Sequence, residues 1–242
     1  MKMKIFAFVC AALLSVGTLV VGAWSSEQSS PMECQCLDIQ ICDSAEHQFV
    51  SVDELRRTLH RNGVAPVGKD LSEVSCQTIE DILLQHSMIR TAECYKLSTG
   101  VMCVDVTQRV PMLQVITADG SYFVDTDRKV MPVRSTINVD VPVLKGNVNQ
   151  QAATEEYYDF VEWLKNNRYW KNRITGIHVR NSEYVVLSQR EVQGNIILGE
   201  LEGYEEKMAR LRKLYTDGFD EIGYKPYKEY DLRFDGQVIG RK

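Results

Sequence analysis

The sequence predicts an α+β fold behind a single N-terminal transmembrane helix. An apolar run from Ile5 to Ala23 is long enough to cross a bilayer. Residues 36–108 then show the order strand, helix, helix, strand, strand. After them the chain changes to short strands with turn signals and a few amphipathic helices, which predicts a mixed β-sheet domain with flanking helices. The expected divisions are a cytoplasmic stub at 1–4, the anchor at 5–23, a linker at 24–35, a βααββ domain at 36–108 and a β domain at 109–242.

The composition is that of a folded protein and excludes one class of partner. Hydrophobic residues make up 44% of the 242 residues and charged residues 25%, both ordinary values for globular domains. The formal net charge of -5 provides no positive field to hold a phosphate backbone. We therefore expect no nucleic-acid partner.

The apolar run decides the expected compartment. Lys2 and Lys4 precede it and Glu27 follows it, so the N-terminus should remain cytoplasmic and the rest of the chain should be exported. A cleaved signal peptide is the alternative, with Val21–Ala23 as the small-residue cleavage site. Cleavable apolar regions usually span about 7–15 residues, fewer than this run. An uncleaved anchor is favoured, and both alternatives export the chain.

The βααββ unit has clear local signals. Leu37, Ile39 and Ile41 alternate with polar residues, as in a half-buried strand. Ser51 and Glu54 have the spacing of a capping box and predict a helix start. A second helix carries an apolar face, and the segments AECYKL and VMCVDV flank a turn at residues 98–100, which predicts a hairpin. The apolar face of the second helix is formed by Ile79, Ile82, Leu83 and His86.

The second half alternates between strands and helices. Turns are expected at Asp119-Gly120 and Asp127-Arg128, and Thr154 is expected to cap a helix with an apolar stripe. ITGIHV, EYVVLS and NIIL read as consecutive strands before a last helix, which should end at Gly218. The residues expected in the two cores are Leu55, Ile82, Val104 and Val106, then Leu113, Val186 and Leu211.

Six of the seven cysteines follow the apolar run, so in an exported chain they can pair. Cys34 and Cys36 lack the CxxC partner or nearby histidine of a metal site. If the hairpin turns at Ser98-Thr99, Cys94 lies opposite Cys103, with Cβ atoms about 4.5–5.5 Å apart. That distance is slightly above the roughly 3.5–4.5 Å of a disulfide. A Cys94–Cys103 bridge and two free buried thiols both remain open.

Motifs for catalysis are missing from the sequence. It contains no glycine-rich phosphate loop, no GxSxG and no HExxH. The four histidines are far apart, and Asp125 and Asp127 lie where aspartates favour a turn. We therefore predict no enzyme activity, no catalytic residue, no metal and no cofactor.

The exported part resembles the bacterial cell-division family FtsQ/DivIB. The βααββ unit is similar to the family's POTRA domain, and VDVTQRVPMLQV is similar to the junction that follows it. SYFVDTDRKVMPV and VPVLKGN resemble the next family elements, in the family's order. GNIILGELEGYEEKMARLRKLY and YDLRFDGQVIG resemble the closing strand, helix and strand. The very short cytoplasmic stub and the number of cysteines depart from the family pattern.

The resemblance implies a non-enzymatic scaffold of the division machinery in the cell inner membrane, with its domains in the periplasm. It implies recruitment through the POTRA domain and binding of the small bitopic proteins FtsB and FtsL by the second domain. The alternatives are a POTRA-bearing component of outer-membrane assembly or secretion, and an anchored periplasmic enzyme. Proteins of the first alternative usually carry several POTRA units, whereas this sequence predicts one.

The last strand is the expected partner-binding edge. No later segment follows Tyr230–Gly240 to cover its outer side, and an uncovered edge can accept a partner strand. The resemblance implies FtsB binding at Phe234, Val238, Ile239 and Gly240 and on the preceding helix at Lys207 and Arg210. Alternatively, Phe234 and Ile239 only complete the core and the basic side chains are solvated.

The anchor can be tested directly. Because the apolar run is longer than a typical signal peptide, we expect the mature protein to retain residues 1–23. N-terminal sequencing of the membrane-bound protein checks this. A mature chain that begins at Trp24 would contradict the anchor and leave export intact.

Overall fold

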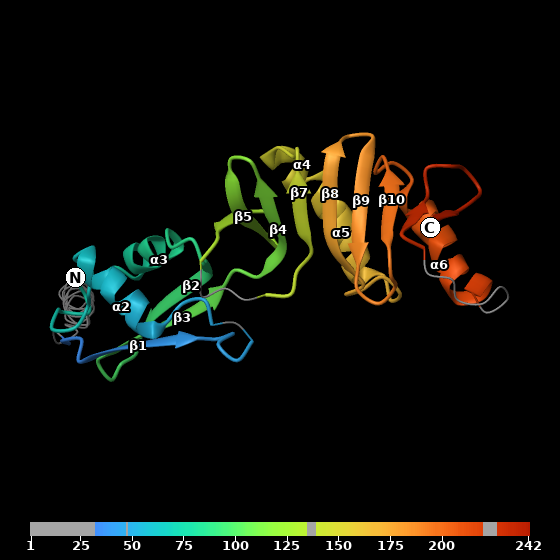
Figure 1. The fold of residues 1–242 in the computed structure, drawn as a ribbon. Helices are drawn as coiled ribbons and strands as arrows, with labels where there is room; N and C mark the ends of the chain where they lie inside the picture. Colours follow the sequence, from blue (N-terminus) through green and yellow to red (C-terminus); the bar gives the residue numbers. More distant parts are fainter. Residues whose placement is uncertain (1–31, 47, 135–138, 220–226) are drawn as a thin grey trace, which may run out of the picture.

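The computed structural model describes residues 32–46, 48–134, 139–219 and 227–242. It is elongated, with one sheet at each end (Figure 1). Its elements confirm a mixed α+β architecture in which a small unit precedes a large β-sheet. The predicted anchor at 5–23 lies outside the described residues. None of the helices within them has both the length and the apolar character that a membrane crossing requires.

The first sheet has three strands in the order β1-β3-β2. β1 (Cys36–Ile41) is parallel to β3 (Val101–Gln108), and β2 (Ile89–Lys96) is antiparallel to β3. The chain between β1 and β2 forms two helices that pack on one face of this sheet, α2 (Val52–Arg61) and α3 (Cys76–Leu84). The predicted order of strand, helix, helix, strand and strand is confirmed.

Both helices begin at serine caps. The hydroxyl of Ser51 accepts a hydrogen bond from the backbone N–H of Glu54 at 3.2 Å, as the capping-box spacing predicts. Ser75 caps α3 in the same way. His86, predicted on the apolar face of the second helix, lies just after the end of α3, and its Nε2 is 3.1 Å from Oε1 of Glu54.

The predicted register of the β2–β3 hairpin is wrong by one residue. Cys94 lies opposite Val104, and Tyr95 lies opposite Cys103. The physical reason is Gly100, which has a φ of 82° and adds one residue to the turn as a bulge, so that Leu97 pairs with Val101. Because side chains alternate along a strand, Cys94 and Cys103 point to opposite faces. Of the two alternatives left open by the sequence, the Cys94–Cys103 bridge is therefore the wrong one, and both thiols are free.

The second sheet has nine strands in the order β12-β11-β10-β9-β8-β7-β4-β5-β6. Parallel pairs join β7 to β4 and β8, and β10 to β11, and the remaining pairs are antiparallel. The bounds are β4 (Pro111–Thr117), β5 (Gly120–Asp125), β6 (Val130–Pro132), β7 (Val143–Gly146), β8 (Ile174–Asn181), β9 (Tyr184–Gln189), β10 (Asn195–Gly199), β11 (Glu229–Asp231) and β12 (Ile239–Arg241).

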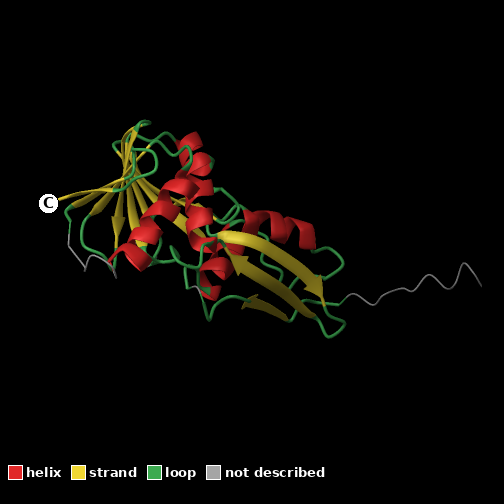
Figure 2. Ribbon diagram, turned by 90° about the vertical axis from the view of Figure 1, so that its right-hand side faces the viewer, coloured by secondary structure: helices red, strands yellow, loops and turns green. Residues whose placement is uncertain are grey.

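The helices of this unit cover one face of the sheet (Figure 2). They are α4 (Gln150–Thr154), α5 (Glu156–Asn166) and α6 (Tyr204–Lys213), which continues as the π-helical turn η1 (Leu214–Gly218). Thr154 does not cap the long helix as predicted. It ends α4, where its hydroxyl donates to the carbonyl of Gln150, and Asn149 is the cap. The carboxamide of Asn149 accepts from the backbone N–H of Ala152 at 2.7 Å.

Most of the predicted core is confirmed. Leu55, Val104, Val106, Leu113 and Leu211 are buried. Two of the predicted core residues are only partly buried, Ile82 and Val186. On β9 the buried positions are the neighbours of Val186, at 185 and 187, so the predicted phase of that strand is wrong by one residue.

The two units share a packed junction. Phe123 on β5 and Met131 on β6 are hydrogen-bonded into the large sheet, yet their side chains belong to the core of the first unit. The buried carboxylate of Asp125 accepts a hydrogen bond from Arg109 at 2.7 Å and also accepts the backbone N–H of Asp127. The turn interpretation of these two aspartates is therefore confirmed, and the junction combines apolar packing with a buried ion pair.

The junction predicts that a residue of the large sheet stabilises the small unit. Met131 is fully buried there, so Met131→Ala should lower the free energy of unfolding by about 2–5 kcal/mol. Val130 on the same strand is 39% exposed, so Val130→Ala should change it by less than about 0.5 kcal/mol. Denaturant unfolding with hydrogen exchange checks both. Unchanged exchange in α2 and α3 of Met131→Ala would contradict the shared core.

Candidate partner-binding edge

The large sheet ends at β12. Within the described residues β12 pairs with β11 alone, and β11 lies between β10 and β12. The predicted edge segment Tyr230–Gly240 is therefore two strands, of which only the second is at the edge. Tyr230 lies on β11 and is fully buried, so its predicted role in contacting a partner is wrong. A later segment does cover β11, because the chain turns back after Phe234.

The outward backbone groups of β12 can be assigned from its neighbours. The carbonyl of Arg241 accepts a hydrogen bond from the N–H of Lys228 at 2.8 Å, so the backbone of Arg241 points inward. Backbone groups alternate in direction along a strand. Ile239 therefore also points inward, toward Asp231 in the register, while Gly240 directs its N–H and C=O groups outward.

A buried carboxylate holds β12 on the sheet. The side chain of Asp231 is fully buried and accepts hydrogen bonds from Nη2 of Arg241 at 2.8 Å and from Nε and Nη2 of Arg233 at 2.9 and 2.8 Å. Hydrogen bonds from Arg233 hold the pKa of Asp231 below its usual range, and the charge of Arg241 acts in the same direction. Asp231 thus links β11 to Arg241 on β12 and to Arg233, which follows the end of β11.

Gly240 is required by a close contact rather than by its φ. A Cβ at this position would lie 2.8 Å from three ring atoms of Tyr227, closer than a side chain tolerates. The ring of Tyr227 packs in turn against Tyr230, with centroids 5.8 Å apart. The aromatic pair supports β12 from one face of the sheet.

The two basic residues expected on α6 both hold backbone carbonyls near this edge. Nζ of Lys207 donates to Glu200 at 2.7 Å, and Nη2 of Arg210 donates to Leu232 at 3.1 Å. Burial lowers the pKa of Lys207 below its usual value. Nε of Arg210 is buried, and the described part of the chain offers it no hydrogen-bond partner. These residues are therefore partly built into the fold, rather than freely solvated.

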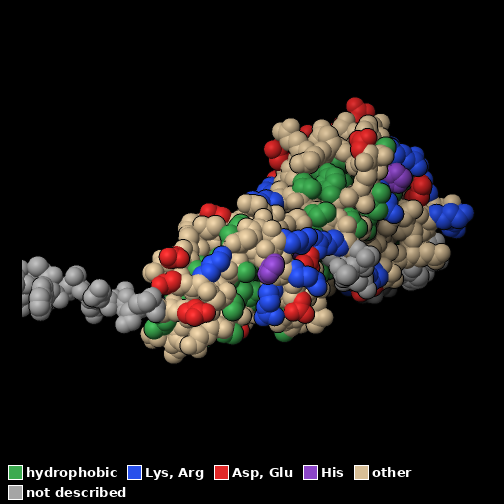
Figure 3. Space-filling view, turned by 90° about the vertical axis from the view of Figure 1, so that its left-hand side faces the viewer, with side chains coloured by type: hydrophobic (Ala, Val, Ile, Leu, Met, Phe, Trp, Pro, Cys, Tyr) green, Lys and Arg blue, Asp and Glu red, His purple; other side chains and the backbone are tan. Residues whose placement is uncertain are grey.

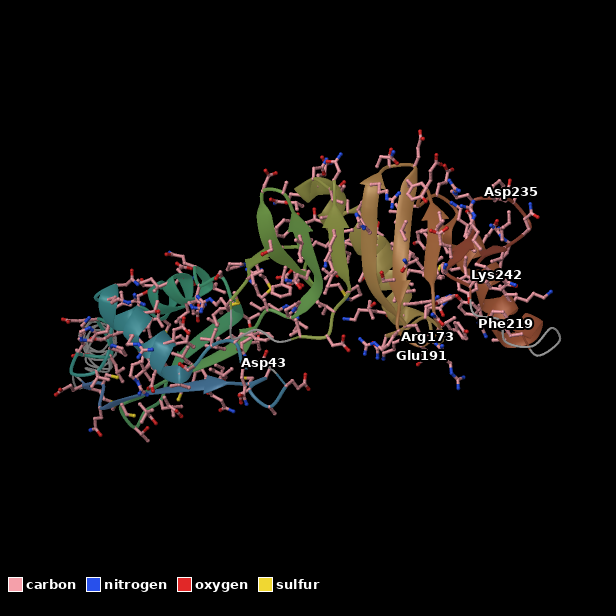
Figure 4. All side chains as sticks on the ribbon, in the orientation of Figure 1. Asp43, Arg173, Glu191, Phe219, Asp235 and Lys242 are labelled. Carbon is pink, nitrogen blue, oxygen red and sulfur yellow. The ribbon has the colours of Figure 1, made fainter. Side chains whose placement is uncertain are left out.

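Beside β12 lies a hollow of about 450 Å³, which we call the C-terminal groove. It opens between α6 with η1 and the loop before β12, at the end of the molecule where Asp235 and Lys242 lie (Figure 4). Val238 forms part of its wall and packs partly on the core, while Phe234 is 43% exposed. The groove is lined by Arg210, Lys213, Leu214, Asp217, Gly218, Gly236, Gln237 and Val238.

A larger hollow, of about 700 Å³, lies in the first unit between β1 and α2. Its lining is mostly apolar, with Arg56, His60 and Lys69 among the polar residues, and no carboxylate is among the described residues that line it. The face of the molecule at this end carries side chains of both charge signs with hydrophobic side chains between them (Figure 3). Cys36 and His60 both line this hollow, but no hydrogen bond joins them, and the described lining residues include no carboxylate to complete an acid–base pair.

Comparison with family models identifies both units. Residues 32–107 match the model described as POTRA-like domain. Residues 110–241, more than half of the chain, match the model described as FtsQ/DivIB, C-terminal related. The chain belongs to the FtsQ/DivIB family. Comparison with curated proteins finds no match. Both matched families are non-catalytic, in keeping with a site made of a strand edge and a groove.

The sequence analysis did not identify three residues that hold β12 on the sheet of this FtsQ/DivIB family member. They are Tyr227, Asp231 and Arg241. An aspartate between the apolar residues Tyr230 and Leu232 is the available signal, because a buried carboxylate requires cationic partners. The signal does not identify those partners, since Arg241 becomes a neighbour only through the pairing of β11 with β12.

The Asp231 cluster predicts a pH-dependent stability. Because the folded pKa is lowered, the stabilisation is present above the unfolded value near 3.9 and is lost as the pH falls through the folded pKa. Asp231→Asn should lower the free energy of unfolding at pH 7 by about 2–4 kcal/mol. The difference from the unaltered protein should close below about pH 4. Denaturant unfolding between neutral and acidic pH measures it.

Asp235 is the matched control, because it is exposed and close in sequence. Asp235→Asn should change stability by less than about 0.5 kcal/mol at every pH. A pH profile of Asp231→Asn that runs parallel to that of the unaltered protein would contradict the role of the buried carboxylate.

Proposed function

We propose that this protein is a non-enzymatic scaffold of the bacterial cell-division machinery that binds FtsB, with FtsL, by strand addition at β12. The family assignment supports a role in cell division. The observation that carries the proposal is the open edge of β12, whose outward N–H and C=O groups have no strand beside them within the described residues. An extended partner segment satisfies such groups with backbone hydrogen bonds.

The C-terminal groove supports the choice of edge. It adjoins β12 through Val238 and continues to the basic side of α6 at Arg210 and Lys213. Apolar side chains of a partner strand can enter it, and an acidic side chain can approach Arg210 and the partly buried ammonium of Lys207. The exposed ring of Phe234 adds an apolar contact at the end of β11. Backbone pairing and these side-chain contacts together provide affinity and specificity.

The proposed location follows from the apolar run. We propose that residues 5–23 anchor the chain in the inner membrane and that both folded units lie in the periplasm. Bitopic partners with periplasmic segments can then reach β12. A scaffold of this kind needs a rigid edge at a defined place, and the junction between the two units provides the rigidity.

The test is a proline substitution on the outward side of the strand. If the alternation of β12 extends one residue before the strand, the N–H of Val238 points outward, so proline at 238 should remove it and leave the inward bonds of Ile239 and Arg241 to β11 intact. Val238→Pro should therefore fold, by circular dichroism, and lose capture of the periplasmic part of FtsB by at least about tenfold. Pull-down and titration with purified FtsB measure the loss.

The matched control is the exposed valine at the other end of the sheet. Val130→Pro on β6 alters the opposite edge, so it should retain full FtsB capture if β12 is the site. Full-strength capture by a folded Val238→Pro protein would eliminate this edge as the binding site. If Val130→Pro lost FtsB capture and Val238→Pro did not, the result would indicate that FtsB binds at β6.

A further inference from the structure

The structure places Cys94 near another cysteine, Cys76. Cys76 is the first residue of α3, and Cys94 lies on β2, which packs against that helix. Residues four apart on a helix lie one above the other, so Cys76 and Glu80 share a face of α3. Glu80 is held against β2, because its Oε1 accepts a hydrogen bond from the backbone N–H of Cys94 at 2.8 Å. Since Cys76 lies one turn before Glu80 on α3, this bond holds the start of the helix near Cys94.

The two cysteine side chains lie in the same layer, between α3 and the first sheet. Cys94 lies opposite Val104, a core residue, so its side chain is on the face of the sheet that α3 covers. Both cysteines are half-buried and pack against the same core. Burial, reinforced by the neighbouring thiol of Cys76, raises the pKa of Cys94 to about 12. No group of three or more metal-binding side chains is formed by the described residues, so a metal site does not explain the pair.

We propose that Cys76 and Cys94 form a disulfide that fastens α3 along the outer edge of β2. β2 is an edge strand of the first sheet, and the N–H of Cys94 points away from β3 to that edge. The bridge would hold the carboxylate of Glu80 over this N–H and keep the edge closed to strand addition. Another chain could then not add a strand to the first sheet at β2.

The chemistry is thiol–disulfide exchange with a low-molecular-weight disulfide such as oxidised glutathione. The Cys76 thiolate attacks one glutathione sulfur, and the S–S bond of glutathione breaks with loss of one glutathione thiolate. The Cys94 thiolate then attacks the Cys76 sulfur and displaces the second glutathione. Two protein thiols are oxidised, one glutathione disulfide is reduced to two thiols, and the two protons pass to the leaving thiolates. The raised pKa of Cys94 makes the second step slow at neutral pH.

The purified full chain tests the proposal without any division partner. It is incubated with oxidised glutathione at about pH 8, alkylated, digested without reduction and analysed by mass spectrometry. A cross-linked peptide pair that contains Cys76 and Cys94 is expected. Its formation should raise the thermal midpoint by about 6–12 °C over the reduced protein. Cys94→Ser should lose both effects, and Cys36→Ser, at an exposed cysteine, should retain them.

The mass spectrum of peptides from the unaltered protein tests the disulfide even if a variant fails to fold. Alkylation of both Cys76 and Cys94 after oxidation would overturn the proposal, as would a link from Cys94 to Cys103. Because the readouts are a peptide mass and a melting temperature, the outcome is independent of FtsB binding. A failed disulfide leaves the proposed scaffold function standing, and the reverse is also true.

Discussion

The hydrogen bonds between the buried carboxylate of Asp231 and Arg241 are the interaction on which the proposed binding edge depends. β12 comprises Ile239–Arg241 and has one neighbouring strand among the described residues, so its backbone bonds alone provide little stability. Asp231 adds charge-assisted hydrogen bonds from Arg241 on β12 and from Arg233 at the start of the intervening loop. The carboxylate therefore holds the strand and the root of its loop together. A partner strand then meets a preformed edge and does not have to order it on binding.

The junction has a second, mechanical consequence. Phe123 and Met131 pack into the core of the first unit while their strands belong to the large sheet. Arg90 adds a bidentate pair with Asp127, at 2.8 Å for each hydrogen bond. The first unit and β12 lie at opposite ends of the elongated molecule (Figure 1). Packing at the junction thus limits how far β12 can turn relative to the first unit, as the proposed scaffold function requires.

Local sequence patterns predicted most of the helices and strands, and the division into a small βααββ unit and a larger β-sheet unit. Ser51 and Glu54 marked a helix start, and the alternation of Leu37, Ile39 and Ile41 marked a strand, because capping and side-chain period depend on neighbours in sequence. Such local patterns could not predict the order of the strands in the large sheet. That β12 covers β11, and that Arg241 reaches Asp231, result from pairing between segments separated by a loop.

Register was the other limit. One bulge residue, Gly100, moved Cys94 from Cys103 to Val104 and turned its thiol toward α3. On β9 an error of one residue placed Val186 in the core instead of its neighbours. Because the side-chain period of a strand is two, each single-residue error reverses the face of a whole strand. The prediction of partner binding at β12 depends less on register, since an edge offers backbone groups whatever its side chains are, and it stays a prediction.

Amide hydrogen exchange at single-residue resolution can detect strand addition at β12, because the inward and outward amides of this strand differ in the free protein. The inward amides of Ile239 and Arg241 should already be protected by β11, while the outward amide of Gly240 should exchange fast. On addition of the periplasmic part of FtsB, exchange at Gly240 should slow by at least about tenfold, with little change at Ile239 and Arg241. A saturated complex in which Gly240 still exchanges at its free rate would contradict strand addition at β12.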